Sequence, residues 1–229
     1  MKYEYKPFYR RKLPHRHSPG GILFVTFRLY GAIPKVVLKE WRNTRDALER
    51  ELAITRDPKS EIENARIEFY RSWFAKFERL LDSSKAGPLW LKDVEVAKIV
   101  YDSLVFRNGK EYELFAFCIM SNHVHVLFKP ILTERSLTSV QAAHSTKLYS
   151  EHPPLGNIMQ SLKGYTARKA NLVLKRTGPF WDAESYDHQV RNDDEFYRIK
   201  RYILNNPVKA GLVSDWRDWR WSFDSALGR

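Results

Sequence analysis

The sequence has little of what would place a protein outside the cytosol or in a membrane. Its 229 residues include a single cysteine, Cys118, so no disulfide can form within the chain; this favours a reducing compartment. No apolar run approaches the ~18 residues that a membrane span requires. The basic, aromatic stretch Met1–His17 lacks the apolar region of a secretion signal. We therefore expect a cytoplasmic protein without membrane contact.

Acidic residues are also scarce relative to basic ones. Lys and Arg total 39 against 27 Asp and Glu, which gives a formal net charge of +12. An excess of this size indicates a polyanionic partner, most often nucleic acid, and an association with the nucleoid would follow. Hydrophobic residues make up 43% of the chain and aromatic residues 14%, which is enough for a folded core.

Hydrophobic periodicity predicts a mixture of strands and helices, the α+β class. We divide the chain into a basic N-terminal arm at 1–21, a core at 22–175 with a helical insert at about 36–106, and a C-terminal extension at 176–229. Thr133–Pro154 reads as a mobile linker, and Phe180–Asp187 as irregular. The predicted strands are 22–29, 112–120 and 123–129, and the predicted helices outside the insert are 155–175 and 193–204.

The run Asn122–Phe128 contains two histidines separated by one apolar residue. Successive side chains of a strand point to opposite faces, so His123 and His125 share one face. Two imidazoles held side by side form half of a divalent-metal site. The other interpretation is an exposed histidine pair without a ligand. Nucleotide hydrolases with alternating histidines would need a third, and that position is Leu127.

A tyrosine follows on the predicted helix 155–175. The spacing places Tyr165 on the apolar face with Ile158 and Leu162, with Lys163 and Arg168 supplying cations nearby. Such a tyrosine is usually a core residue. A nucleophilic tyrosine would instead need cations or a metal beside its target phosphate. The residue types alone leave both possibilities open.

Several segments resemble, in the same order, the REP-associated tyrosine transposases, single-tyrosine enzymes with a His-hydrophobic-His (HUH) signature. The resemblance covers the first strand and nearly everything from about Tyr112 to Trp221. The segments that carry it are Phe24–Leu29, Met120–Leu127, Leu162–Arg168, Gly178–Trp181, Glu184–His188 and Tyr202–Leu212.

This resemblance implies a ferredoxin-like antiparallel sheet that presents the histidines beneath the tyrosine helix. It implies that His123 and His125 hold Mg²⁺ or Mn²⁺. It further implies that Tyr165 attacks single-stranded, hairpin-containing DNA and forms a 5′-phosphotyrosine that a 3′-hydroxyl can reverse. Such a protein would act as a monomer or a homodimer.

One position departs from the family pattern. These enzymes usually take a third metal ligand four residues after the tyrosine, and here that residue is Lys169, whose ammonium cannot ligate. Asn171 or an acidic group such as Glu184 would have to substitute. The candidate contacts to DNA phosphates are Lys163, Arg168, Lys169 and Arg191.

Two other functions remain open from the sequence. One is a different HUH enzyme, a replication initiator or a relaxase. The other is a domesticated DNA-binding protein that has lost catalysis, for which Lys169 is the reason. The insert at 36–106 is expected to cover one sheet face, with a DNA or partner surface as the alternative. Trp181 and the tryptophans of 216–221 are expected to pack against the core rather than stack on bases.

Overall fold

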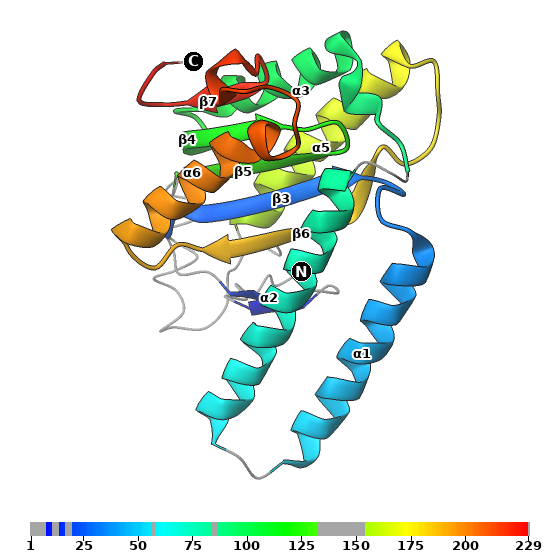
Figure 1. Cartoon of the computed structure of the whole chain (residues 1–229), viewed down its shortest axis with the longest axis vertical. Helices are drawn as coiled ribbons and strands as arrows, with labels where there is room; N and C mark the ends of the chain where they lie inside the picture. The colour runs from blue at the N-terminus through cyan, green and yellow to red at the C-terminus, as the bar shows by residue number, and fades with distance from the viewer. Residues whose placement is uncertain are drawn as a thin grey trace, which may run out of the picture.

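The computed structural model describes most of the chain (Figure 1). The described residues are 8–10, 14–16, 20–55, 58–83, 87–131 and 154–228. The expected linker at Thr133–Pro154 lies almost wholly outside them. The strands are β1 (Phe8–Arg10), β2 (Pro14–Arg16), β3 (Leu23–Leu29), β4 (Tyr112–Ile119), β5 (His123–Pro130), β6 (Trp181–Gln189) and β7 (Ser222–Asp224). The helices are α1 (Lys35–Ile54), α2 (Lys59–Ser83), α3 (Val94–Arg107), α5 (Pro154–Val173) and α6 (Asp193–Lys209), with short 3-10 helices at Trp90–Lys92 and Trp216–Asp218.

Five strands form one antiparallel sheet in the order β6-β3-β5-β4-β7. If β3, β4, β5 and β6 are numbered along the chain, their order in the sheet is 4-1-3-2. The crossovers between them carry α3 and α5, which pack on the same sheet face. This is the ferredoxin-like arrangement, so the predicted α+β fold class is confirmed.

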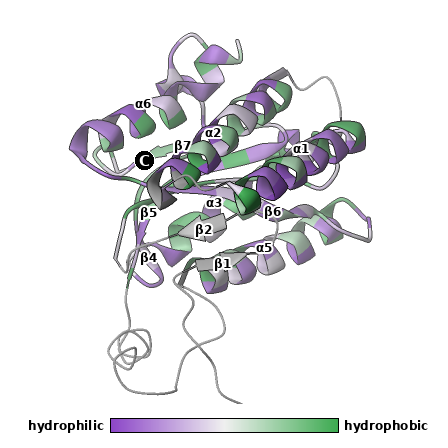
Figure 2. Ribbon diagram, turned by 90° about the horizontal axis from the view of Figure 1, so that it is seen from below, coloured by the Kyte–Doolittle hydropathy of each residue, from purple (hydrophilic) through white to green (hydrophobic). Residues whose placement is uncertain are grey.

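The sheet has an apolar cluster on each face because strand side chains alternate between the two faces. Val124 and Val126 of β5 belong to the first cluster, together with Ile158 and Leu162 of α5. Leu127 belongs to the second cluster, which contains apolar residues of α6. Figure 2 shows α2 and α6 on one side of the sheet and α5 on the other. We call these the α5 face and the α6 face.

The structure changes two of the predicted boundaries. The helix at Val94–Arg107, placed within the insert, is a core helix of the ferredoxin-like unit, so the insert proper is the hairpin of α1 and α2. The segment Phe180–Asp187, expected to be irregular, forms most of the core strand β6. The core therefore continues beyond residue 175, into the part that we assigned to a C-terminal extension.

The predicted end of helix 193–204 is also wrong. The helix α6 continues through Pro207 to Lys209. Proline lacks the N–H for one helical hydrogen bond, but the helix goes on, and Ala210 N–H donates to the carbonyl of Asn206 (2.9 Å). The extra turn keeps Asn206 fully buried against the sheet.

The hairpin of α1 and α2 projects from one end of the sheet (Figure 1). The last turns of α2 lie over the α6 face, where Phe74 stacks on Tyr186 of β6 with ring centroids 3.8 Å apart. Arg28 of β3 lies 5.7 Å from the centroid of the Phe77 ring. The insert therefore covers part of one sheet face, as expected.

The C-terminal tryptophans pack against the core, also as expected. Trp219 donates its indole N–H to the carbonyl of Ile119 (3.0 Å), and Trp221 is buried. Trp181 donates its indole N–H to the Thr166 hydroxyl (2.8 Å). In the described part of the chain no helix is both long enough and apolar enough to cross a bilayer.

The base of the hairpin depends on glycine. Gly87 has a φ of +79°, and a Cβ there would lie 2.8 Å from the Cα of Ala32 and closer still to the carbonyl oxygen of Gly31. We predict that Gly87→Ala lowers the free energy of unfolding by roughly 2 kcal/mol or more, since backbone strain and a backbone clash combine. The control is Gly109→Ala, which has a similar φ of +75° but open space, and should cost only about 1 kcal/mol. Urea unfolding measures both, and equal losses would contradict the close approach.

Candidate active site

The two histidines of β5 converge on one point of the α6 face. Their Nε2 atoms lie 2.9 Å apart, and both side chains are fully buried. Asn122 accepts a hydrogen bond from His123 Nδ1 (2.7 Å), and its own amide donates to the carbonyl of Leu81 in α2 (3.1 Å). Thr26 of β3 bonds His125 Nδ1 (2.8 Å). These outer bonds hold each ring with Nε2 turned inward, as metal-binding histidines usually are.

Both imidazoles are neutral in this environment. Burial lowers the pKa of His123 to about 3, with a smaller contribution from the positive charge of Lys209. The pKa of His125 is lowered by burial first, then by His123 and Lys209. A neutral imidazole keeps a lone pair for a metal ion, whereas an imidazolium has none.

A carboxyl group from the insert joins the two histidines to form a cluster of three possible metal ligands. Glu78 of α2 places Oε2 3.3 Å from His125 Nε2, and the ligand atoms of Glu78, His123 and His125 all lie within 4.8 Å of one another. Burial raises the pKa of Glu78 to about 8, so the side chain is mainly protonated at neutral pH without a metal. Its other oxygen, Oε1, is buried with no hydrogen-bond partner among the described residues.

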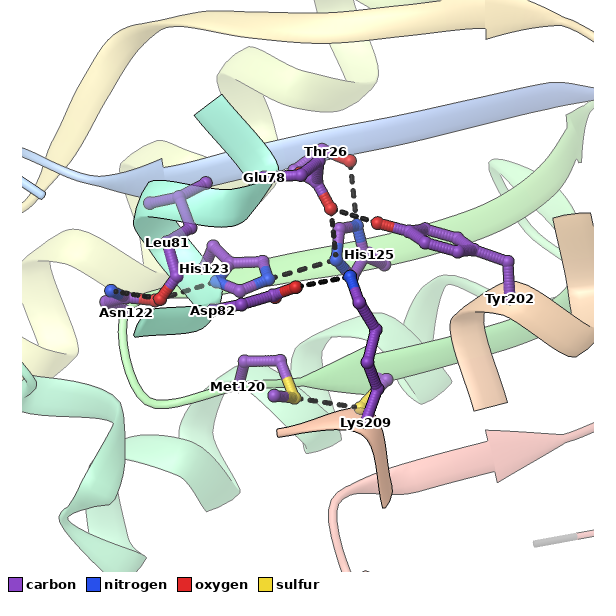
Figure 3. Close-up of polar contacts among 11 residues, drawn as sticks. Thr26, Glu78, Leu81, Asp82, Met120, Asn122, His123, His125, Tyr202 and Lys209 are labelled. Carbon is purple, nitrogen blue, oxygen red and sulfur yellow. Dashed lines mark hydrogen bonds and ion pairs between the residues drawn. The ribbon is translucent and has the colours of Figure 1, made fainter. Parts of the chain in front are cut away.

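A tyrosine of α6 reaches the same carboxyl group. The Tyr202 hydroxyl donates a hydrogen bond to Glu78 Oε2, and its ring lies edge-on to His125 with centroids 5.5 Å apart (Figure 3). Burial, and then the Glu78 carboxyl, raise the pKa of Tyr202 well above its usual value. The hydroxyl and the imidazole thus share one oxygen atom as a neighbour.

One helical turn after Tyr202 comes a buried amide. Asn206 is fully buried, and neither its Oδ1 nor its Nδ2 has a hydrogen-bond partner at ordinary distance within the described structure. It lies close enough to the Tyr202 hydroxyl to lower the pKa of that group. A native interior rarely leaves a buried amide with so few close partners, so this side chain has room to bind a ligand or an ordered water.

A cation also faces the site from α6. Lys209 Nζ pairs with Asp82 of α2 at 2.5 Å, and its charge lowers the pKa values of both histidines. Figure 3 shows Lys209 and Asp82 beside the imidazole rings. Tyr202, Asn206 and Lys209 therefore lie one after another along the same side of the helix α6.

The donor set fits a hard or borderline divalent ion. Cis ligands of an octahedral ion with bonds near 2.1 Å are about 3 Å apart, and the two Nε2 atoms are 2.9 Å apart. A carboxylate and two imidazoles suit Mn²⁺, Fe²⁺ or Zn²⁺ better than Mg²⁺, which prefers oxygen ligands. The unpaired oxygens of Glu78 and Asn206 could fill further positions.

The structure does not place Tyr165 in this site. The tyrosine lies on α5, which packs on the opposite sheet face, and its side chain is 45% exposed rather than core-directed. The Arg107 guanidinium lies 5.9 Å from its ring centroid. The expectation that the histidines lie beneath this helix is wrong, because Val124 and Val126, not the histidines, point toward α5.

The other predicted residues of α5 are also remote from the histidines. Lys163 donates to the carbonyl of Asp182 (3.1 Å) and to the Ser185 hydroxyl (2.7 Å) of β6. Asn171 uses both ends of its amide, donating to the carbonyl of Gly178 and accepting from Arg176. Arg168 and Lys169 are exposed on the same helix.

Two further candidates lie outside the metal-ligand group. Glu184 is buried on β6 but is not part of the carboxyl–histidine cluster. Arg191 is exposed just before α6 and lines a pocket of about 370 Å³ with Arg71 and Arg198. Their roles as ligand and as DNA contact therefore stay predictions.

Sequence reasoning missed Glu78, Tyr202, Asn206 and Lys209. The signal for two of them was present, since Tyr202 and Asn206 are four residues apart, the spacing expected for the nucleophile and its ligand. Ending the helix before Asn205 concealed that they share a face. Nothing in the local sequence marks Glu78, because its helix belongs to the insert.

Fold and site together define an α+β protein of ferredoxin-like type, with a His-x-His pair, a carboxyl group and a tyrosine on one sheet face. No known protein-family profile matches the chain. A protein of Haemophilus influenzae provisionally named a REP-associated tyrosine transposase is 24% identical over 111 residues. That match covers 48% of this chain and spans 58% of the relative's length.

A solved structure of a REP-associated tyrosine transposase bound to a REP hairpin also aligns with this chain. The alignment covers 93% of this chain and 80% of that one, with 14% identity and a TM-score of 0.49. The sequence match confirms the resemblance to REP-associated tyrosine transposases that the motifs indicated.

Metal binding gives a direct test of the cluster. We predict that His125→Ala weakens Mn²⁺ binding by at least tenfold, because one of two convergent imidazoles is lost. Asn171→Ala serves as the control and should bind Mn²⁺ as the native protein does, since its amide lies away from the cluster. Titration calorimetry measures both, and a loss with Asn171→Ala would contradict this assignment.

The raised pKa of Glu78 predicts a pH dependence of stability in EDTA. Because its folded pKa is about 8 against an ordinary 4.5, the folded state holds this proton more tightly than the unfolded state. The contribution of Glu78 to the free energy of unfolding is therefore fully present below about pH 4.5, and it is lost as the pH rises through about 8. Glu78→Gln removes this loss, so its thermal midpoint should exceed that of the native protein increasingly from pH 6 to 9. Parallel curves would show that Glu78 is not buried as described.

Proposed function

We propose that this protein nicks and rejoins single-stranded DNA through a covalent tyrosine intermediate, as a metal-dependent transposase of the REP-associated type. The observation that supports this most is one face of the helix α6, which places a tyrosine hydroxyl, a buried amide and a lysine beside the two histidines. The sequence match to a protein with that name supports the substrate class, and the net charge of +12 suits a polyanion.

In this proposal Tyr202, not Tyr165, is the nucleophile. The Tyr202 oxygen attacks the phosphorus and its proton passes to a base. The bond from phosphorus to the 3′ oxygen breaks, and that oxygen takes up a proton from water. The products are a 5′-phosphotyrosine and a free 3′-hydroxyl. The reverse attack by a 3′-hydroxyl rejoins a strand, and the phosphotyrosine linkage conserves the energy of the bond, so no nucleotide cofactor is needed.

His123, His125 and Asn206 would hold the divalent ion, with Glu78 as a further ligand when α2 covers the site. The bound ion would polarise the phosphate and offset the charge that develops on it. Thr26 and Asn122 keep the imidazoles oriented. Because all these groups belong to one chain, the proposal requires no partner subunit, and a monomer is sufficient.

The structure bears on one of the two alternative functions that the sequence left open. A domesticated DNA-binding protein was suggested by Lys169, but Lys169 is exposed on α5, away from the histidines. A replication initiator or relaxase would use the same chemistry on another DNA. Cleavage at hairpins flanking the gene, rather than at a plasmid origin, separates these from a transposase.

The nucleophile can be identified with a pair of matched substitutions. We predict that the native protein and Tyr165→Phe form a covalent adduct with hairpin-containing single-stranded DNA in Mn²⁺, and that Tyr202→Phe forms none. EDTA should abolish the adduct, which a denaturing gel detects. Loss of the adduct in Tyr165→Phe alone would restore the original assignment. DNA binding without an adduct in any variant would favour the DNA-binding protein.

A further inference from the structure

The site as folded is closed to a DNA strand. His123, His125 and Asn206 have no exposed surface, and Glu78 is 4% exposed. The cover is the C-terminal half of α2, whose contacts with the sheet and α6 come from Phe74 to Asp82. An enzyme that acts on a phosphodiester here must first move this helix.

Two acidic side chains of α2 contact the residues of the candidate active site. Glu78 and Asp82 are four residues apart and therefore share one face of the helix. Glu78 accepts the hydrogen bond of Tyr202 and approaches His125, while Asp82 pairs with Lys209. The insert thus engages the tyrosine, one histidine and the lysine at once.

These are the contacts that a bound phosphodiester would make. Its anionic oxygens would contact the ion that the histidines hold and the Lys209 ammonium, and its phosphorus would lie beside the tyrosine hydroxyl. Each carboxyl group also retains one buried oxygen without a partner in the described structure, Glu78 Oε1 and Asp82 Oδ1. Asp82 therefore holds the lysine as a phosphate oxygen would, and the carboxyl group of Glu78 occupies the place beside the tyrosine hydroxyl and His125.

We propose that Glu78 and Asp82 act as an intramolecular pseudo-substrate, so that the hairpin of α1 and α2 inhibits its own active site until DNA displaces it. Lys209, released from Asp82, then binds the scissile phosphate. This inference rests on the proposed function, because it assumes that the ligand is a DNA strand.

The hairpin is built to move as one piece. Its two ends meet where Gly87 passes against Gly31, and both glycines have positive φ. α1 and α2 are joined by Arg66, which pairs with Glu49 (2.9 Å), and by Lys76, which pairs with Glu40 (2.9 Å). These bonds hold the two helices together. Opening breaks the contacts from Phe74 to Asp82 and the packing of Val37 and Leu38 of α1 against the core.

The test compares two double variants that each replace two acidic side chains of α2 by their amides. Glu78→Gln/Asp82→Asn removes the two contacts, whereas Glu61→Gln/Glu68→Gln changes exposed positions of the same helix. In EDTA we measure binding of a fluorescein-labelled, hairpin-containing single-stranded oligonucleotide by anisotropy. We also measure amide hydrogen exchange of residues 59–83 with and without that DNA.

The proposal predicts three results. The first double variant binds DNA at least tenfold more tightly than the native protein, and the control double variant binds as the native protein does within twofold. DNA speeds amide exchange in 59–83 of the native protein but not in β4. Adding Lys209→Ala to the first double variant removes most of the gain in affinity.

Other outcomes overturn the proposal in distinguishable ways. DNA that binds all proteins equally, with unchanged exchange in 59–83, would make α2 a fixed cover and leave the proposed function standing. An equal gain in both double variants would reduce the effect to net charge. No DNA binding by any protein would remove the pseudo-substrate and the proposed DNA chemistry together. Exchange in the native protein needs no substitution, so misfolding of a variant does not obscure the result.

Discussion

The site depends on two imidazoles held without charge inside the protein. Alternation along β5 directs His123 and His125 to the face opposite Val124 and Val126. Burial then disfavours the protonated form and lowers the pKa of both rings. The lone pairs are thereby available for a metal ion, and bonds from Thr26 and Asn122 keep both Nε2 atoms pointed at one place.

The same burial governs the groups around the histidines. A carboxylate without a positive partner is costly in such surroundings, and Glu78 accordingly keeps its proton to about pH 8. Tyr202 is held protonated as well, by burial and by the carboxyl group beside it. Under the proposed function, the tyrosine is a poor nucleophile in the covered state. Moving α2 would expose the Tyr202 hydroxyl and take away the Glu78 carboxyl group, the two causes of its raised pKa. The position of the insert would then control the reactivity of the site.

The location of the tyrosine shows how helix boundaries decide an active site. Two tyrosines lie in motifs of the family, on α5 and on α6, and their hydroxyls end on different sides of the sheet. Only Tyr202 has an amide one turn later on a buried face, and that turn exists because α6 continues through Pro207. A proline inside a helix removes one hydrogen bond, but burial of the apolar residues Ile203 and Leu204 of the same helix can offset that cost.

The sequence alone determined the strands around the histidines, the pairing of His123 with His125 and the α+β class, and its net charge predicted a polyanionic partner. These follow from local signals, namely alternation, turn residues and charge. Only the tertiary structure decided which helix faces the histidines, because an amphipathic pattern predicts that a helix packs on a sheet but not on which of its two faces. It also decided the role of the insert, since Glu78 and Asp82 meet Tyr202 and Lys209 across more than a hundred residues of chain. Contacts of that separation depend on how the sheet closes, and no local periodicity encodes it.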